Sequence, residues 1–424
     1  MKMKSRNGKE EPGTEIFGHA GYLKINILGF ALTALWTSLH SIILPIRIIE
    51  LVPESQKNTY LGILTLSGLL LAMIVQPVFG VISDRSHSSL GRRRPYILLG
   101  ACLALLFVPG TGLGNSYVLT FVAYCLLQVS CNIAQASYQA FIPEMVPFEK
   151  RGTASGIKTL LEVLGGVVMV RLIAYFMGRY FGGEGALWFW MSLGILMFVL
   201  LSAAVLTVVS VKEQAGNQAR TSYFSYEGLK IDFKVRHDLL WFLVSRSLMG
   251  IPGVVLQIFT MYYLMDVVGI RNPAAMAGDL LVVAGVCLLA AVYPAGRISD
   301  KVGRRPVIIA SGMVGAGGIV LLFFARSNTP LMLAGGLLGV ANGAMLSSTW
   351  ALATDLAKKN EEAKYLGLTG IAVSGGSALA RLMGPVIDFF NGISSGLGYQ
   401  VMLLVCLLGF IIGALLVVKI KDNC

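Results

Sequence analysis

Long apolar runs, separated by short polar segments, dominate the chain. Each run holds about 20 or more mainly apolar residues, the length that an α-helix needs to cross the hydrocarbon layer of a membrane. We therefore predict twelve transmembrane helices, of which the third is short and contains Pro109 and Gly110, so that we expect a break or a tilt there. The predicted spans of the first half are 23–46, 59–83, 95–114, 117–142, 153–178 and 186–211. Those of the second half are 238–266, 275–297, 305–325, 330–354, 365–389 and 397–420.

A charged pattern, which we call the cassette, occurs twice, each time on the loop between the second and third spans of a half. The first copy is Gly80-x-x-x-Asp84-Arg85 … Gly91-Arg92-Arg93-Arg94-Pro95. The second copy is Gly296-x-x-x-Asp300-Lys301-x-Gly303-Arg304-Arg305-Pro306. The repeat also extends further, because Glu144 and Asp355 follow Asn132 and Asn342 at similar distances in the two halves. We predict an all-α integral membrane fold of two six-helix pseudo-repeats with the same orientation and a cavity between them.

The composition agrees with a chain that is surrounded mainly by lipid. Hydrophobic residues make up 55% of it and charged residues 13%, whereas soluble domains carry roughly 25% charge, and the mean hydropathy is +0.73. The net charge of +12 does not indicate nucleic acid, because most Lys and Arg fall on the two cassettes and on polar segments of the same side. By the positive-inside rule, both termini then lie in the cytoplasm of a multi-pass plasma-membrane protein.

This orientation gives the expected organisation of the chain. It consists of a cytoplasmic N-terminal tail (1–22), a six-helix half (23–211), a cytoplasmic linker (212–236), a second six-helix half (237–420) and a cytoplasmic C-terminal tail (421–424).

The sequence carries no pattern typical of an enzyme or of a metal site. The six cysteines have no paired or metal-ligand spacing, and the four histidines form no H-x-x-x-H pattern. There is also no nucleophile elbow and no phosphate-binding loop. We therefore expect a protein that is not an enzyme and has no cofactor or bound metal. If it moves a solute, we expect an ion gradient to supply the energy.

The doubled G-x-x-x-D-[RK]-x-G-[RK]-[RK] loops resemble those of the major facilitator superfamily, and the resemblance covers nearly the whole chain. The first cassette, with Val75-Gln76-Pro77 before it and Tyr96-Ile97 after it, is similar to that of the sucrose–proton symporters of plants and their animal relatives. It resembles the glycoside–pentoside–hexuronide carriers more loosely. Asn132-x-x-Gln135 and Glu144 extend the likeness, whereas the sucrose carriers have an arginine where this chain has Gln139.

The resemblance implies that the cassettes latch the two halves together on the cytoplasmic side. Asp84 would meet the start of the eleventh span near Gly367, and Asp300 the start of the fifth near Gly152. A carboxylate at a helix start gains roughly 0.3–1 kcal/mol from the helix dipole. The alternative is that the arginines only anchor the loops to anionic lipid. The latch residues are Gly80, Asp84, Arg85, Gly91, Arg92, Arg93, Gly296, Asp300, Lys301, Gly303, Arg304 and Arg305.

Ionisable residues inside the spans are functional candidates, because a charge in lipid is costly. Glu162 lies near the middle of the fifth span and is a candidate proton-coupling carboxylate, although Lys158 precedes it by one turn and could simply pair with it. Arg171 and Asp279 are candidates for an external gate, unless Asp279 only caps a helix end in water. Arg246, in the seventh span, is a candidate guard of the cytoplasmic mouth, unless its side chain extends to the interface.

Three further titratable residues have two interpretations each. Arg381 lies in the outer half of the eleventh span, where it could bind an anionic substrate or hold Asp388, seven residues further on. Asp388 and His40 are additional candidates for proton coupling, and a histidine can also be a satisfied packing residue.

The fourth span carries a polar stripe of four amides that are three or four residues apart. Such amides must face a cavity or another helix, where they would either bind a polyhydroxylated ligand or hold helices together. The candidate residues of a substrate cavity are Gln128, Asn132, Gln135, Gln139, Trp36, Tyr262, Asn342, Trp350 and Arg381.

The leading functional hypothesis is a secondary transporter that alternates between two access states, as a proton-coupled symporter of a sugar or glycoside. The first alternative is a proton-coupled exporter of an amphipathic organic compound, which Gln139 favours over a sucrose-type carrier. The second is a receptor or pigment-assembly factor on the same fold that transports nothing. We expect a monomer in the lipid bilayer whose partners are a small-molecule substrate and a coupling ion, a proton in the leading hypothesis, with sodium left open.

Overall fold

The computed structural model describes residues 19–86, 88–211, 237–356 and 362–420, in which all regular secondary structure is helical. The helices before residue 212 are α1 (His19–Ser38), the π-helical turn η1 (Leu39–Ile43), α2 (Leu44–Leu51), α3 (Lys57–Asp84), α4 (Arg94–Phe107), α5 (Gly110–Leu113), α6 (Tyr117–Gln139), α7 (Phe141–Met145), α8 (Arg151–Phe181) and α9 (Leu187–Ser210). Those after residue 236 are α10 (His237–Tyr263), the π-helical turn η5 (Leu264–Val268), α11 (Pro273–Val302), α12 (Arg304–Phe324), α13 (Asn328–Leu356), α14 (Glu362–Arg381), α15 (Met383–Ile393) and α16 (Leu397–Val417). Most of the expected N-terminal tail, the central linker and the C-terminal tail lie outside the described residues.

Within these ranges, twelve helical segments are long and apolar enough to cross a membrane. The predicted all-α membrane fold and its twelve spans are therefore confirmed. The third span is broken as expected, because α4 ends at Phe107 and a separate turn of helix starts at Gly110, after Pro109. The eleventh span is also broken, at Leu382 between α14 and α15, which the sequence analysis did not predict.

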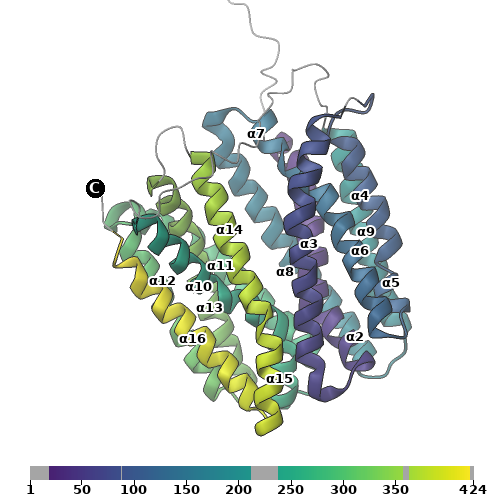
Figure 1. Cartoon of the computed structure of the whole chain (residues 1–424), viewed down its shortest axis with the longest axis vertical. Helices are drawn as coiled ribbons and strands as arrows, with labels where there is room; N and C mark the ends of the chain where they lie inside the picture. The colour runs from purple at the N-terminus through teal and green to yellow at the C-terminus, as the bar shows by residue number, and fades with distance from the viewer. Residues whose placement is uncertain (1–18, 87, 212–236, 357–361, 421–424) are drawn as a thin grey trace, which may run out of the picture.

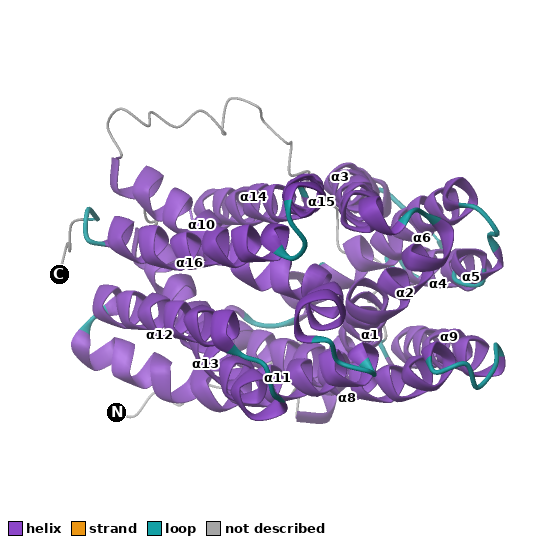
Figure 2. Cartoon of the chain, turned by 90° about the horizontal axis from the view of Figure 1, so that it is seen from below, coloured by secondary structure: helices purple, strands orange, loops and turns teal. Residues whose placement is uncertain are grey.

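The helices form two groups that lie side by side (Figure 1). In the first group α1 packs against α8 and α9, and α6 packs against α3 and α4. In the second group α13 packs against α11 and α12, and α10 packs against α14 and α16. The groups meet along two seams, α8 beside α11 and α3 beside α15, which Figure 2 shows from the end of the bundle. Equivalent pairs of helices thus recur in the two groups.

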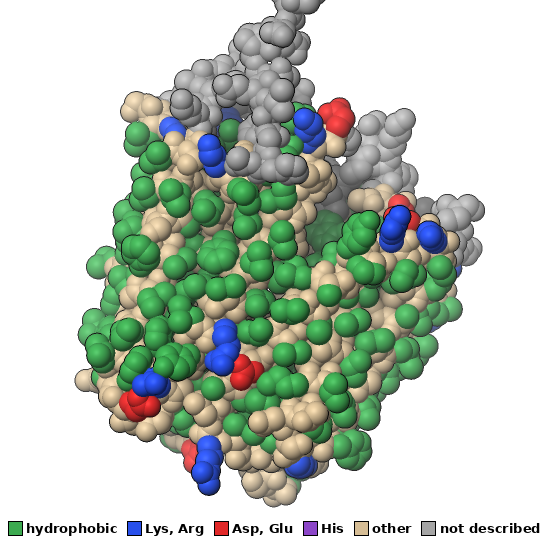
Figure 3. Space-filling model, turned by 180° about the vertical axis from the view of Figure 1, so that it is seen from behind, with side chains coloured by type: hydrophobic (Ala, Val, Ile, Leu, Met, Phe, Trp, Pro, Cys, Tyr) green, Lys and Arg blue, Asp and Glu red, His purple; other side chains and the backbone are tan. Residues whose placement is uncertain are grey.

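The two groups are in contact on one side of the membrane and apart on the other. In Figure 1, α14 and α3 diverge toward the end at which α7 lies, and α15 and α3 lie close together at the opposite end. We call the first end the cassette side, because both cassettes lie there. At this side a Cβ built on Gly152 or Gly367 would meet nothing within 4 Å. In Figure 3 the surface is hollowed between the two lobes at the upper edge. The structure is therefore open on the cassette side.

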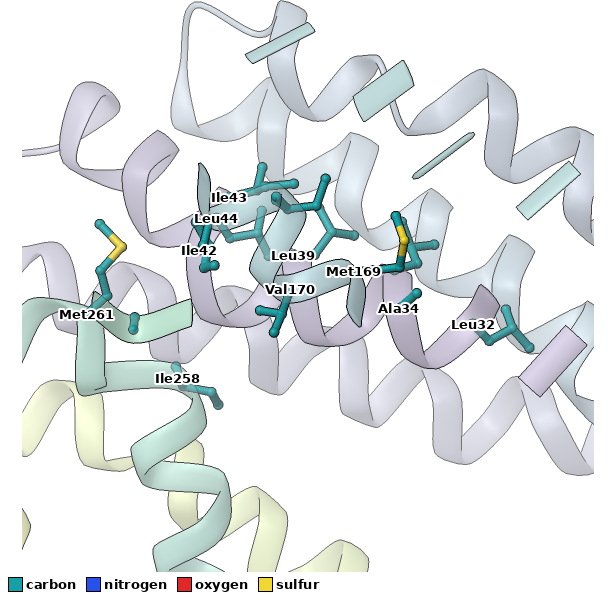
Figure 4. Close-up of a cluster of buried hydrophobic side chains, with 14 of the residues drawn as sticks. Leu32, Ala34, Leu39, Ile42, Ile43, Leu44, Met169, Val170, Ile258 and Met261 are labelled. Atoms are coloured by element: carbon teal, nitrogen blue, oxygen red, sulfur yellow. The ribbon is translucent and has the colours of Figure 1, made fainter. Parts of the chain in front are cut away.

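The exterior and the interior are both apolar, as expected for a protein in lipid. Hydrophobic side chains cover the face in Figure 3, where most charged side chains gather near the upper and lower edges. Inside, the π-helical turn η1 inserts Leu39, Ile42 and Ile43 between the two groups, against Val170 of α8 and Ile258 of α10 (Figure 4). A π-turn widens the helix locally and often marks a functional position.

Glycines permit the closest helix contacts, which leads to a first prediction. A Cβ on Gly165 of α8 would lie 2.2 Å from the carbonyl oxygen of Phe30 in α1, so a side chain cannot fit unless the helices separate. We expect Gly165→Leu to destabilise the first group by about 1–3 kcal/mol or more, the usual cost of overpacking. The midpoint of thermal unfolding in detergent measures this. Gly156→Leu is the matched control, because it is on the same helix with nothing within 4 Å; an equal loss in both variants would contradict the prediction.

Candidate functional site

The two cassettes have the same local structure. In the first, α3 ends at Asp84, and in the second, α11 ends just after Lys301. Gly91 and Gly303 then turn the chain at φ values of 108° and 99°, a backbone conformation that side chains disfavour. The arginine run that follows each glycine starts the next helix, α4 or α12. This explains why each cassette requires a glycine directly before its arginines.

On the cassette side, the ion pairs between described residues connect side chains of the same group. Arg93 binds both Asp84 and Glu144, and Arg92 lies 2.9 Å from the second oxygen of Glu144. These contacts tie the ends of α3 and α7 to the start of α4.

The second cassette repeats this arrangement. Arg304 binds Asp300 and lies 3.2 Å from Asp355, at the end of α13. Glu144 and Asp355, at the ends of the fourth and tenth spans, therefore form ion pairs with the arginines of the two cassettes. The sequence repeat indicated only their similar positions.

The latch contacts that the resemblance implied are not present in this conformation. Asp84 and Asp300 bind arginines of their own cassettes, and the space around Gly152 and Gly367 is open. The physical reason is that the two groups are apart on this side, so that neither carboxylate can reach the helix start of the other group. The other cassette residues lie along the same surface. Gly80 and Gly296 are inside their helices, Arg85 and Lys301 are exposed at the helix ends, and Arg305 is half-buried in the first turn of α12.

A continuous chain of hydrogen bonds crosses the middle of the first group. Nε2 of His40, in η1, lies 2.9 Å from the hydroxyl of Tyr124, which accepts a hydrogen bond of 2.6 Å from Gln128. Asn132 donates to Oε1 of Gln128 over 3.1 Å and accepts a hydrogen bond of 2.6 Å from Gln76 of α3. These groups are uncharged donors and acceptors except for the imidazole, whose charge depends on its protonation.

The polar stripe of the fourth span is therefore divided between two environments. Gln128 and Asn132 are buried, and Asn132 ties α6 to Gln76 of α3, whereas Gln135 is half-buried and Gln139 is exposed. Trp36 stacks on the ring of His40 with 5.5 Å between the ring centroids. The stripe and its aromatic neighbours thus lie together, and part of the stripe holds helices.

The candidates in the second group are placed differently from one another. Asn342 lines a mainly apolar cavity of about 160 Å³ between α10, α11 and α13, together with Gly253 and Gln257. Trp350 is 47% exposed. Tyr262 is fully buried and donates its hydroxyl hydrogen to the carbonyl of Pro45, 2.8 Å away in the first group. In this conformation its buried side chain joins the two groups, and its assignment to a substrate cavity stays a prediction.

Two of the hypothesised ion pairs are present. Lys158 lies 3.8 Å from Glu162, and both side chains are half-buried. Arg171 lies 2.7 Å from Asp279, across the seam between α8 and α11. The roles of Glu162 in coupling and of the second pair as a gate remain predictions.

The proposed pairing of Arg381 with Asp388 is wrong. Arg381 donates to the carbonyl of Ser377 and has no ion pair among the described residues. Asp388 instead accepts hydrogen bonds of 2.8 Å from the Asn58 side chain and 2.6 Å from the backbone N–H of Thr59. The two residues were expected on one continuous helix, but the break at Leu382 separates α14 from α15.

The sequence analysis missed a polar network that joins the two groups on the side opposite the cassettes. Lys57, which is 2% exposed, lies 2.8 Å from Asp266 in η5. Tyr399 donates a hydrogen bond of 2.5 Å to the other oxygen of Asp266. Asn58 lies 3.3 Å from the same tyrosine hydroxyl and also binds Asp388. We call these five residues the outer closure. The sequence offered little sign of it beyond Lys57 and Asp266, two charged residues at the ends of apolar runs.

Buried Arg47 was also missed, because the predicted first span ended one residue before it. It pairs with Glu50 one turn later and donates to the carbonyls of Gly112 and Gly114. The second of these hydrogen bonds is 2.8 Å long. Arg47 therefore closes the end of the broken third span.

A family model described as MFS/sugar transport protein matches residues 56–420 of the chain. The chain belongs to this family. It is therefore a secondary transporter of the major facilitator superfamily, as the doubled cassette indicated, in a multi-pass membrane fold.

The curated relatives include a sugar permease and a multidrug efflux pump. The lactose permease of Leuconostoc lactis is 23% identical over 304 residues, which are 66% of this chain and 47% of the permease. The chain thus spans about half the length of that relative. The multi-drug resistance efflux pump PmrA of Streptococcus pneumoniae is 24% identical over 375 residues, 83% of this chain and 89% of the pump.

Solved structures agree on the fold. The D-xylose-proton symporter superposes with a TM-score of 0.71 at 15% identity, over 96% of this chain and 99% of that one. The nucleoside transporter NupG gives a TM-score of 0.72 at 12% identity, over 95% of this chain and 99% of that one. At such identities the likeness concerns the fold alone.

Proposed function

We propose that this transporter of the MFS/sugar transport protein family carries a sugar or glycoside by alternating access, coupled to protons. The observation that carries the proposal is the chain of hydrogen bonds from His40 through Tyr124 and Gln128 to Asn132 and Gln76. Neutral donors and acceptors beside an aromatic ring suit the hydroxyl groups and the apolar ring face of a sugar. The resemblance of the first cassette to sucrose–proton symporters supports the same substrate class.

The proposal includes an orientation and a cycle. With the cassette side in the cytoplasm of the plasma membrane, as the distribution of Lys and Arg favours, the structure is the inward-open state of a monomer. The two six-helix halves would rock about the central site, so that the outer closure opens as the cassette side closes. In that second state Asp84 and Asp300 would reach the other half, and Arg171 and Asp279 would separate.

The test is uptake into liposomes that contain the purified protein. A panel of radiolabelled sugars and glycosides is offered with the outside acidic, with and without a protonophore. We expect saturable accumulation of at least one compound that collapses with the protonophore. Absence of flux for the whole panel, in protein shown to be folded, would contradict the sugar assignment.

Glu162 is the proposed coupling carboxylate, which leads to a second prediction. We expect Glu162→Gln to abolish accumulation driven by the proton gradient, because the amide cannot take up or release a proton, while counterflow of substrate without a gradient continues. Lys158→Gln is the matched control, since it removes the other member of the pair at 3.8 Å. If accumulation survives Glu162→Gln, or if both variants fail equally, the carboxylate serves only the pairing.

An exporter of amphipathic organic compounds is the second candidate function. The observation that favours it is the mainly apolar lining of the 160 Å³ cavity, which offers only a few polar groups such as Gln257, Thr260 and Asn342. The efflux pump PmrA among the relatives supports it as well. A panel of amphipathic compounds, tested for proton-driven extrusion, follows if the sugars fail.

A further inference from the structure

Two guanidinium groups inside the second group have no counter-ion among the residues that the structure describes. Arg246 of α10 is 8% exposed, and its Nη1 donates to the hydroxyl of Thr349 in α13. Arg381, at the end of α14, donates only to the carbonyl of Ser377, over 2.8 Å. In both residues Nε is buried without a hydrogen-bond partner. An arginine has five N–H donors, so most of its hydrogen-bonding capacity is unused here.

Arg381 lies on the polar face of α14. Gly370, Ser374 and Ser377 precede it at helical steps of three or four residues, and a Cβ on Gly370 would meet nothing within 4 Å. Of the exposed apolar side chains of this helix, Leu379 lies on the opposite face, and Ile371 and Val373 flank the polar face at about 80° on either side. Lipid favours apolar side chains, so we assign the open polar face between these flanks to the aqueous space between the halves.

Arg381 also lies at the seam with the first half. A Cβ on Gly62 of α3 would lie 2.5 Å from its backbone carbonyl oxygen. Six residues further along α3, a Cβ on Gly68 would lie 2.6 Å from the hydroxyl of Tyr124 and from the amide nitrogen of Gln128, which belong to the chain of hydrogen bonds. Arg381 therefore lies against the same helix that packs on the proposed substrate site.

Arg246 lies on the face of α10 that continues toward the cavity. Gly250, Gly253 and Gln257 follow it at steps of four, three and four residues. The space at Gly250 is open, and the other two line the 160 Å³ cavity. The partner Thr349 lies seven residues from Asn342 on α13, which lines the same cavity.

The two arginines lie at different depths. Ser247, next to Arg246, donates its hydroxyl hydrogen to the carbonyl of Ala372. Arg381 is nine residues further along α14, which is about 13 Å along the axis at 1.5 Å per residue. An ion moving from the central site to the cassette side would therefore pass Arg381 and then Arg246.

No described carboxylate near this path is available to compensate these charges. Glu162 already has Lys158 at 3.8 Å, and Asp388 is held by Asn58 and Thr59 in the outer closure. A buried cation without a counter-ion is costly in a membrane protein and is retained where it serves a ligand.

We infer that the transported sugar or glycoside carries an anionic group, a carboxylate or a phosphate, which binds Arg381 in the central site and Arg246 on the way to the cassette side. A guanidinium fits both groups, because it donates two parallel N–H bonds to a pair of their oxygens. The inference rests on the proposed function and narrows its substrate class from neutral to acidic sugars.

The experiment compares ligands that differ only in charge. Purified full-length protein is titrated with glucose, glucuronate and glucose 6-phosphate at constant ionic strength, and the midpoint of thermal unfolding is followed. Uptake of the same three compounds is then measured in liposomes. We expect stabilisation by several degrees and saturable uptake for one acidic sugar, and at least tenfold weaker effects for glucose. The carboxylate and phosphate arms decide between the two anionic groups.

Variants connect the effect to the arginines. We expect Arg381→Gln to weaken binding of the acidic sugar at least tenfold, and Arg246→Gln to slow its uptake at least tenfold. Arg381→Lys, which keeps the charge, should retain the preference for the acidic sugar. Arg326→Gln is the control, because Arg326 is an exposed arginine of the same half that donates to the backbone carbonyls of Phe323 and Ala325. Without ligand, Arg381→Gln should be at least as stable as the wild type, whereas a purely structural arginine would lose stability.

The outcomes separate the inference from the proposed function. One outcome is that the protein takes up glucose, shows no preference for acidic sugars, and is unaffected by Arg381→Gln and Arg246→Gln. This outcome would overturn the inference, but the proposed function as a sugar transporter would stand. Binding of octanoate but of no sugar, lost in Arg381→Gln, would support the anion site and overturn the sugar assignment. If neither octanoate nor the acidic sugars bind more tightly than glucose, the anion site is refuted.

Discussion

Asp266→Asn is expected to open the outer closure. The asparagine keeps the size of the side chain and an oxygen for the hydroxyl of Tyr399, but it leaves the ammonium of Lys57, 2% exposed, with only the exposed carboxylate of Glu54, 3.5 Å away, as a counter-ion. Removing one partner of a buried ion pair costs about 3–5 kcal/mol. Since the Asp266 side chain is 22% exposed, we expect the lower end of this range. A change of about 3 kcal/mol shifts the ratio of the two access states about 100-fold.

Spin labels can measure this shift without knowledge of the substrate. Leu113 and Ile393 are exposed helix ends of the two halves on this side, 66% and 65% exposed. Labels at both positions, in a protein without its native cysteines, should show a longer distance component in Asp266→Asn. Proton-driven uptake should fall at least tenfold, because the cycle passes through the state in which this side is closed.

Two controls make the interpretation specific. Lys57→Met combined with Asp266→Leu removes both charges, so we expect it to restore much of the short distance. Glu54→Gln removes a second carboxylate 3.5 Å from the same ammonium, but its side chain is 83% exposed. Such surface pairs contribute about 0–1 kcal/mol, and uptake should change less than twofold. Unaltered label distances in Asp266→Asn would refute a closing role for this ion pair.

The sequence was sufficient to predict the fold. Lipid fixes the length and polarity of every span, so the apolar runs give the twelve helices directly. The doubled cassette gives the repeat, and Pro109 gives the break in the third span, because proline cannot donate the hydrogen bond that would continue the helix. These features depend only on neighbours along the chain.

The contacts between helices were harder to predict. The pairing of Arg171 with Asp279 could be hypothesised because both lie in the outer part of helices that face each other across the halves, and the contact is present. The pairing of Arg381 with Asp388 failed because nothing in the sequence marks the break at Leu382. Lys57 was treated as a loop residue, although the fold buries it against Asp266 at the far end of another helix.

The conformational state could not be predicted at all, because one sequence encodes both access states. In the proposed cycle, the predicted latch contacts of Asp84 and Asp300 would form in a state closed on the cassette side, whereas the outer closure is present in the state described here. The contacts of one state must be broken in the other, so a single structure displays only half of the functional contacts. Predictions about the cycle therefore depend on positions whose environment differs between the states.

Glycines provide such positions, because α3 approaches α14 and α15 without intervening side chains. A Cβ on Gly384 would lie 2.2 Å from the carbonyl oxygen of Asn58, and one on Gly62 would lie 2.5 Å from that of Arg381. These contacts join the two halves. A larger side chain here should therefore prevent closure of the outer side without disturbing the packing inside either half.

Gly384→Leu is expected to hold the transporter open on the outer side. Asp266→Asn weakens the closure and leaves a mixture of states, but a leucine at residue 384 excludes the closed geometry sterically. Nearly the whole distribution of distances between spin labels at residues 113 and 393 should then lie in the long component. Uptake should fall by about two orders of magnitude or more, because a penalty above about 3 kcal/mol for closing the outer side lowers the closed population about 100-fold. Gly392→Leu is the matched control on the same helix, because nothing lies within 4 Å of its Cβ position. A folded, monodisperse Gly384→Leu protein that still transports would show that the halves can close without this backbone contact.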